Sequence, residues 1–244
     1  MQIEFINIAS HELRTPMQPI IGLTQIIRSK IKDTEQIELL DTVIRNAKRL
    51  KQLTDDIFDV TRIESHSLNL NKEQFDLNEQ IKTVINDIKN QINIRYNNNA
   101  IKLLFEAQGK QGNGVSIKAD KVRIQEVISN LLNNAIKFTN EGTIYITTEE
   151  KKKKKKTGKG GEVIVKIKDT GIGMPSNILP NLFSKFATGS PFKRGIGLGL
   201  FISKSIIEAH GGKIWAENNA DGKGATFAFS LPLSKEHELS GLSN

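Results

Sequence analysis

The stretch Asn130-Leu131-Leu132-Asn133-Asn134-Ala135-Ile136-Lys137-Phe138 organises the second half of this chain of 244 residues. Apolar residues recur at helical spacing through it and before it, and Asp120 stands where a helix N-cap is expected. The pattern predicts a helix from residue 120 to about residue 138. Asn130, Asn134 and Lys137 lie at positions i, i+4 and i+7, so they share one face. Asparagine weakens a helix, which indicates that this polar face serves a purpose other than folding.

Helical and strand patterns alternate around that helix. Residues 75–94 are predicted to be mainly helical, and residues 198–210 form a helix that Gly211-Gly212 ends. Short strands are predicted from alternating or apolar runs at residues 101–106, 115–118, 143–148, 163–168, 214–217 and 225–231. The fold class is therefore α+β, with an antiparallel or mixed sheet layered against helices.

The first part of the chain is all helical. Residues 1–31 and 35–65 both show apolar side chains at helical spacing, and the short join between them makes the two helices antiparallel neighbours. Two helices alone cannot enclose a core, so a second copy is expected to complete a four-helix bundle in a homodimer. The expected domains are residues 1–66, a linker at 67–71, residues 72–233 with an insertion at 151–159, and a tail at 234–244.

Composition narrows the function classes. No apolar run reaches the ~20 residues that span a bilayer, no signal peptide is seen, and zero Cys fits a reducing cytosol. We therefore expect a cytoplasmic protein segment without membrane contact. The net charge of +8 is local, because Lys151 to Lys156 and Lys159 supply seven positive charges, and 8 − 7 leaves +1. A nucleic-acid-binding face is not expected.

One histidine stands out in the run His11-Glu12-Leu13-Arg14-Thr15-Pro16. At ~100° per residue, His11 lies about 200° from Leu13 and faces away from the apolar stripe. Near pH 7 much of such a histidine is neutral and has a nucleophilic nitrogen lone pair. Taken alone, His11 would be an ordinary solvated histidine, and Glu12 and Thr15 would be ordinary helix residues.

Two glycine-rich motifs follow further along. Asp169-Thr170-Gly171-Ile172-Gly173-Met174 comes directly after a predicted strand, where a carboxylate can accept an amino group and glycine lets the backbone approach a ring. Gly195-Ile196-Gly197-Leu198-Gly199-Leu200 runs into a helix, and N–H groups at a helix start attract phosphate. The second motif is not a Rossmann fingerprint, because no strand immediately precedes it.

In this order, the motifs closely resemble the catalytic kernel of a sensor histidine kinase over nearly the whole chain. The resemblance also includes Phe183 and Phe186 beside a nucleotide lid and Gly222-Lys223-Gly224-Ala225-Thr226 as a last glycine box. It implies a dimerisation and phosphoacceptor domain followed by an α/β-sandwich ATP-binding domain of the Bergerat type. His11 would then take the γ-phosphoryl group, Glu12 would act as its base or orienting group, and Thr15 would help to place a water for dephosphorylating a partner.

The resemblance also implies ATP and Mg²⁺ as cofactors and a response regulator as the partner that receives the phosphoryl group. Asn134, with Asn130 next to it, is expected at the metal. The remaining nucleotide contacts expected from the resemblance are Lys137, Phe138, Asp169, Gly171, Gly173, Lys193, Arg194, Gly195, Gly197, Leu198, Gly199 and Thr226.

Some alternatives stay open on the sequence. A gyrase-like or chaperone-like ATPase shares the nucleotide fold, and a catalytically silent dimeric scaffold shares the helices. The lysine run is best explained as a solvated tip, with binding to an anionic membrane or nucleic acid as the weaker idea. Pro19, three residues after Pro16, is expected to bend the first helix near His11. Whether phosphorylation occurs within or between chains is not readable from the sequence.

Overall fold

The computed structural model describes residues 2–96, 100–108, 114–151, 161–187 and 196–234; within these, the side chains of 2–11, 14, 91–96 and 108 are outside the description. The chain divides into two compact units, Met1–Asn69 and Leu70–Asn244. Among the helices described, none is both long and apolar enough to cross a bilayer.

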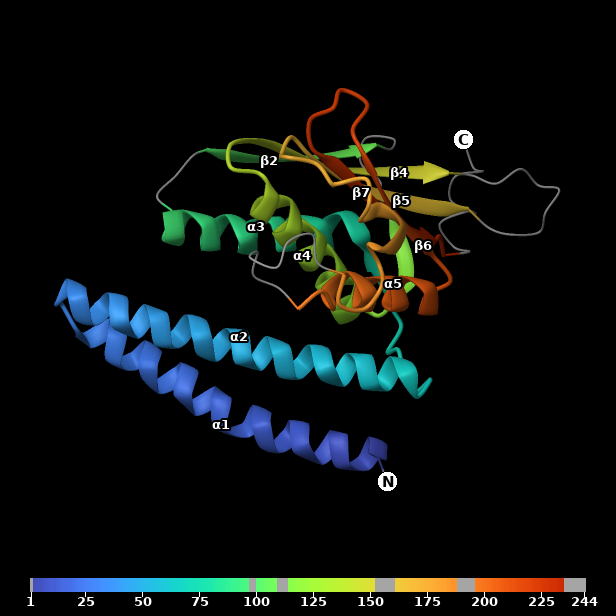
Figure 1. The fold of residues 1–244 in the computed structure, drawn as a ribbon. Coiled ribbons are helices and arrows are strands. Elements are labelled where there is room, and N and C mark those ends of the chain that lie inside the picture. Colours follow the sequence, from blue (N-terminus) through green and yellow to red (C-terminus); the bar gives the residue numbers. More distant parts are fainter. Residues whose placement is uncertain (1, 97–99, 109–113, 152–160, 188–195, 235–244) are drawn as a thin grey trace. The chain divides into compact units, whose positions relative to one another are not determined.

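The first unit is a hairpin of two long helices, α1 (Gln2–Lys30) and α2 (Thr34–Glu64) (Figure 1). The turn between them is held by Asp33, whose carboxylate accepts the N–H of Gln36 at 2.8 Å and caps α2. Close to the turn, Arg28 forms a forked ion pair with Asp41, with Nη2 3.0 Å from Oδ2. This pair fixes the register of the two helices near the turn.

Helix α1 continues through both prolines, Pro16 and Pro19. Met17, Ile44 and Ala47 are buried, whereas other apolar side chains of the hairpin remain exposed. Apart from Ile26, the exposed ones recur every three, four or seven residues along each helix, so each helix keeps an apolar stripe open to solvent. We call these residues the open stripes: Leu13, Ile20, Leu23 and Ile27 on α1, and Leu39, Val43, Leu50 and Ile57 on α2.

The second unit is built on a five-stranded sheet in the order β2-β4-β5-β7-β6. Only β2 and β4 run parallel, and the other neighbours are antiparallel, so the sheet is mixed, as expected. The strands are β2 (Ile101–Gln108), β4 (Gly142–Lys151), β5 (Glu162–Asp169), β6 (Lys213–Asn218) and β7 (Ala225–Pro232).

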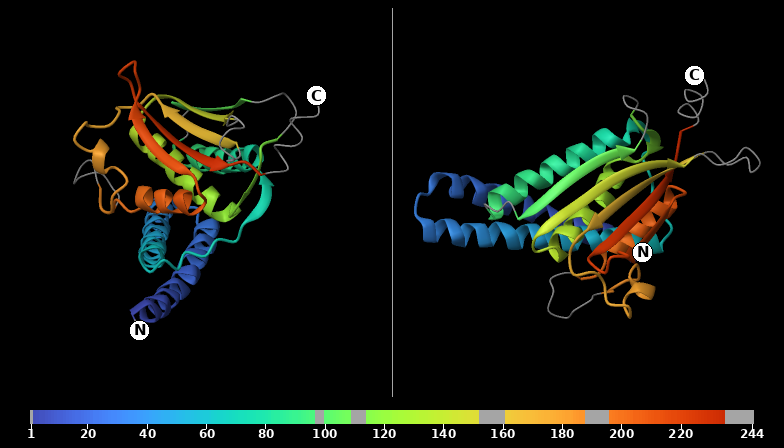
Figure 2. Two further views of the ribbon diagram at one scale, coloured as in Figure 1. Left: turned by 90° about the vertical axis from the view of Figure 1, so that its right-hand side faces the viewer. Right: turned by 90° about the horizontal axis from the view of Figure 1, so that it is seen from above.

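Three helices lie against one face of this sheet: α3 (Leu77–Tyr96), α4 (Lys121–Phe138) and α5 (Gly199–Ala209) (Figures 1 and 2). A short 3-10 helix, η2 (Leu179–Asn181), lies in the segment before α5. The core between sheet and helices is almost entirely aliphatic. Its fully buried side chains include Leu77, Ile81, Ile124, Ile128, Leu131, Leu132, Ile144, Ile146, Ile167, Ile206 and Phe229.

The predicted start of α3 is wrong by two residues. Phe75 and Asp76 belong to β1 (Glu73–Asp76), which pairs antiparallel with β3 (Ser116–Ala119) in a separate two-stranded sheet. The helix begins after Asp76, whose carboxylate accepts the N–H of Asn78 at 2.8 Å. The local sequence lacked a strand signal because the partner of β1 lies about forty residues away.

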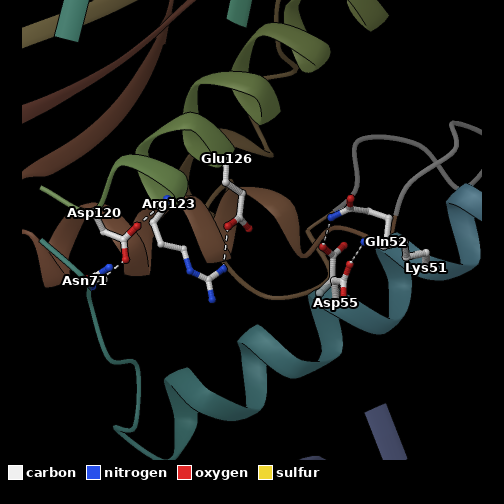
Figure 3. A network of polar contacts seen from close by, with 8 residues as sticks. Lys51, Gln52, Asp55, Asn71, Asp120, Arg123 and Glu126 are labelled. Atoms are coloured by element: carbon white, nitrogen blue, oxygen red, sulfur yellow. Dashed lines mark hydrogen bonds and ion pairs between the residues drawn. The ribbon is translucent and has the colours of Figure 1, made fainter. Parts of the chain in front are cut away.

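Asp120 caps α4 as predicted, and its carboxylate also accepts a second bond. One oxygen accepts the N–H of Arg123 at 3.1 Å, and the other accepts the N–H of Asn71 at 2.9 Å (Figure 3). On the next turn of the helix Arg123 pairs with Glu126 at 2.8 Å. The first residues of the second unit are thereby tied to the start of α4.

Candidate functional site

The asparagine face of α4 meets the start of α5. Nδ2 of Asn130 donates to the hydroxyl of the buried Ser203 at 2.9 Å. A Cβ added to Gly199 would lie 2.6 Å from Oδ1 of Asn130, so a larger residue there would have to displace the Asn130 side chain. The sequence placed Asn130 and Gly199 in separate motifs, and the structure brings them into contact.

Further along the same face, Asn134 is half-buried and Lys137 is exposed. The Lys137 ammonium lies 5.1 Å from the centroid of the Phe138 ring. Among the described residues no group of three or more His, Cys, Asp or Glu side chains could hold a metal ion. The asparagine amide oxygens are hard neutral donors of the kind that suits Mg²⁺ when phosphates and waters complete its shell.

Asp169 closes β5 and is buried, with 3% of its surface exposed. One carboxylate oxygen accepts the N–H groups of Gly171 at 2.9 Å and Ala225 at 3.3 Å. Burial raises the pKa of the Asp169 carboxyl, and these backbone hydrogen bonds oppose the rise. The second oxygen has no partner in the described part of the structure, so it remains available to accept from a ligand.

The Asp169 motif and the asparagine motif are joined at the end of α4. The carbonyl oxygen of Phe138 accepts the N–H of Ile172 at 3.2 Å. A Cβ on Gly171 would lie 2.3 Å from that same carbonyl oxygen. The glycine in the motif is therefore required for the backbone to approach α4 this closely.

The last glycine box, residues 222–226, contacts the backbone of Asp169. Gly224 has a φ of +74°, and a Cβ there would lie 2.1 Å from the Asp169 carbonyl oxygen. Two residues that the sequence reasoning missed complete this region. Asn218 clamps Met174 with two bonds of 2.8 Å to its backbone N–H and carbonyl, and Asn219 bonds to the Asp169 carbonyl. Asparagine beside a turn is so common that no local signal distinguished this pair.

The structure does not bring Thr226 to the Asp169 carboxylate. In the β5–β7 ladder Thr226 is paired with Lys168, and side chains alternate between the two faces of a strand. Ala225 thus shares the Asp169 face, while the Thr226 hydroxyl lies on the opposite face and donates to Asn219 at 2.7 Å. Ala225 is therefore the residue of the last glycine box beside the Asp169 carboxylate, and the contact of Thr226 with the nucleotide stays a prediction.

The glycine motif before α5 is only partly described. Lys193, Arg194 and Gly195 lie outside the described residues, as does most of the lysine run. Gly197 has a φ of +77°, and its carbonyl accepts the N–H of Phe186 at 3.0 Å. Leu198 is buried and precedes α5, whose start has no side-chain cap. Uncapped N–H groups at the start of a helix can bind an anion.

The histidine motif lies in the first unit. The backbone of His11 is helical within α1, but its side chain is outside the described residues. Glu12 and Thr15 are both exposed on the same helix. The described structure therefore supports the helical setting of this motif and leaves the direction of the imidazole as a prediction.

Families of known proteins match residues in each of the two units. Residues 1–66 match the family described as His Kinase A (phospho-acceptor) domain, and residues 119–235 match the family described as Histidine kinase-, DNA gyrase B-, and HSP90-like ATPase. The solved catalytic domain of histidine kinase ThkA is 34% identical with a TM-score of 0.55, over 68% of this chain and 97% of that domain. The chain belongs to the histidine kinase family.

Two curated relatives are longer proteins. Histidine kinase 5 of Arabidopsis thaliana is 31% identical over 247 residues, which cover 91% of this chain and 26% of the relative. Autoinducer 2 sensor kinase/phosphatase LuxQ of Vibrio parahaemolyticus is 30% identical over 240 residues, or 97% of this chain and 27% of the relative. The chain thus spans about a quarter of the length of these relatives.

Proposed function

We propose that the chain is the catalytic kernel of a two-component sensor kinase, which phosphorylates His11 from ATP and passes the phosphoryl group to an aspartate of a response regulator. The observation that carries this proposal is the convergence of four distant motifs in the second unit. Asn130 meets Gly199, Phe138 meets Gly171 and Ile172, and Asp169 meets Gly224. A phosphoacceptor helix of the matching family precedes them.

In this proposal the base and the phosphates are held by different parts of the second unit. The free oxygen of Asp169 accepts from the adenine amino group, with Gly171 and Gly173 allowing the ring to approach. The phosphates lie at the start of α5, near Gly197, Leu198 and Gly199. Further contacts to phosphate come from Lys137, beside which Phe138 lies. They also come from Lys193, Arg194 and Gly195, which lie outside the described residues.

Mg²⁺ would be held by Asn134 with Asn130 beside it, and when bound it neutralises phosphate charge. An imidazole nitrogen of His11 attacks the γ-phosphorus, and the bond from phosphorus to the bridging oxygen breaks to release ADP. Glu12 orients the imidazole and takes its proton. Thr15 helps to place a water that hydrolyses the phosphorylated response regulator and releases inorganic phosphate. The reaction is expected in the cytoplasm.

The open stripes support a homodimer. Single exposed apolar residues are ordinary on a protein surface, but two continuous stripes on adjacent helices indicate a partner surface. A second copy of the same hairpin would bury these stripes in a four-helix bundle.

Labelling with ATP that carries a radioactive γ-phosphate tests the proposal. The chain should gain an acid-labile, base-stable label, which His11→Gln should abolish because no other group in the helix replaces the nucleophile. His66→Gln is the matched control, since His66 is exposed in the same unit, and it should keep the label. A label that persists in His11→Gln would remove His11 from this role. Release of phosphate without any labelled protein would favour a gyrase-like ATPase, and no saturable ATP binding would favour a scaffold.

A further inference from the structure

Asn219 is a polar residue that the proposed mechanism does not yet use, although it is 91% buried. Its exposed fraction is 9%, and all hydrogen-bonding groups of its amide are occupied. Nδ2 donates to the carbonyl oxygens of Asp169 at 2.8 Å and Lys223 at 2.6 Å, and Oδ1 accepts from the Thr226 hydroxyl at 2.7 Å. Three strand ends are therefore joined by one side chain.

The orientation of this amide is determined by its partners. Two carbonyl oxygens can accept only from the NH₂ group, so a flipped amide would place oxygen against oxygen. Oδ1 must then face Thr226, and the Thr226 hydroxyl must be the donor. Asn219 consequently holds the Asp169 carbonyl with a specific group in a specific direction.

The turn between β6 and β7 does not need this contact in order to close. The N–H of Asn219 donates to the Gly224 carbonyl at 3.1 Å, and the N–H of Gly222 donates to the Asn219 carbonyl at 3.0 Å. Asp221 adds a bond of 3.1 Å to the N–H of Lys223. The bond from the Asn219 side chain to Asp169 reaches out of the turn to the end of β5, where the base is expected to bind.

We propose that Asn219 is a positioning residue for base recognition, which holds the peptide after Asp169 so that the free carboxylate oxygen faces the exocyclic amino group of adenine. This inference rests on the proposed nucleotide site. At the same place guanine has a carbonyl oxygen, which a carboxylate cannot donate to, so a well-held Asp169 also rejects GTP. If Asp169 is held less firmly, the preference for adenine over guanine should weaken more than the affinity for the phosphates.

The test measures dissociation constants of the whole chain for ATP, GTP and inorganic tripolyphosphate by calorimetry. Asn219→Ala should weaken ATP binding by roughly tenfold, the effect of losing one hydrogen bond. Affinity for tripolyphosphate should stay unchanged, and affinity for GTP should stay level or rise because guanine is rejected less strictly. Asp221→Ala is the matched control, because it loosens the same turn without contacting Asp169, and it should keep the ratio of ATP to GTP affinity. An unchanged ratio in Asn219→Ala would overturn the inference.

A double-mutant cycle separates this inference from the proposed function. If Asn219 acts through Asp169, then Asn219→Ala should add no further loss of ATP affinity in an Asp169→Asn background. Failure of the wild-type chain to bind ATP, or an unchanged affinity in Asp169→Asn, would contradict the nucleotide site itself. A weakened Asp169→Asn with full additivity would contradict only the role of Asn219.

Thr226 provides a second route if Asn219→Ala does not fold. Thr226→Val keeps both donor bonds of Asn219 but leaves its buried Oδ1 without a donor, which weakens the hold of Asn219 on Asp169, so the ATP to GTP ratio should fall by roughly threefold. Thr226→Ser restores the hydroxyl and should restore the ratio. Equal ratios in the Val and Ser variants would overturn the inference.

Discussion

Gly222 and Gly224 show how two residues with the same backbone conformation can differ in importance. Both have a φ of +74°, which is unfavourable for any residue with a Cβ. Around Gly222 there is nothing within 4 Å of an added Cβ, whereas at Gly224 it would lie 2.1 Å from the Asp169 carbonyl oxygen and 2.8 Å from Oδ1. One glycine serves the turn, and the other serves the turn and the candidate base site.

Alanine substitutions at these two positions should therefore separate stability from binding. Gly222→Ala should cost about 1–2 kcal/mol of unfolding free energy, the usual penalty for a left-handed residue, and should leave ATP affinity unchanged. Gly224→Ala should lose at least as much stability and also weaken ATP binding by more than about tenfold, since Asp169 must move. Urea unfolding and calorimetric titration check the two outcomes. Equal ATP affinities for both variants would contradict the contact between Gly224 and Asp169.

At the scale of elements, the start of α4 and the end of α5 are joined by a buried histidine. Nδ1–H of His210 donates to the Ile206 carbonyl at 2.8 Å, and Nε2 accepts the N–H of Asp120 at 2.9 Å. Only the neutral ring can make both bonds. Burial lowers the pKa of His210 below its usual 6.5, and the charge of Lys72 lowers it further. The hydrogen bond to the Ile206 carbonyl and the charge of Asp120 raise this pKa, but the net shift is downward.

This histidine predicts a loss of stability in mild acid. Above pH of about 6.5 His210 is neutral in both states and adds no pH dependence. Below it the unfolded chain binds a proton that the native ring resists, so the free energy of unfolding falls until the native pKa is reached. Fluorescence of Trp215, the only tryptophan of the chain and part of β6, reports unfolding of this unit in urea. His210→Asn should be less stable at pH 7.5 but show a flatter decline to pH 5.5. An equal decline in both proteins would contradict the assignment.

At the scale of the whole molecule, the open stripes on α1 and α2 determine the expected assembly. Leu23→Glu places a charge on the stripe of α1 and should dissociate the homodimer, because burying an unpaired carboxylate costs several kcal/mol. Sedimentation measurements should show a monomer, with the helix content of the second unit retained. Gln25→Glu is the control, since Gln25 is exposed about 200° around the helix from Leu23, and it should remain dimeric. A monomeric wild-type chain would refute the homodimer.

Much of the fold was predictable because its signals are local. The cap at Asp120 and the apolar spacing of α4 both lie within a short stretch of sequence. The end of α5 is equally local, because Gly211 adopts a φ of +78° there. Strand β1 was missed because its pairing with β3 is non-local. The candidate site was predictable as a set of motifs, but not as a set of contacts: Ser203 behind Asn130 and the Asn218–Asn219 pair carry no signal of their own.

The amino-acid order alone therefore established the helices, most strands, the two-part organisation and the family, since each depends on periodicity, caps or motif spacing. Which residues touch one another depended on three-dimensional packing. A pleated strand turns alternate side chains to opposite faces, so a shift of one position put Ala225 rather than Thr226 beside the Asp169 carboxylate. Likewise, the approach of two loops around Asp169 made Asn219 a central residue, because hydrogen bonds across β5, β6 and β7 exist only once the sheet has formed.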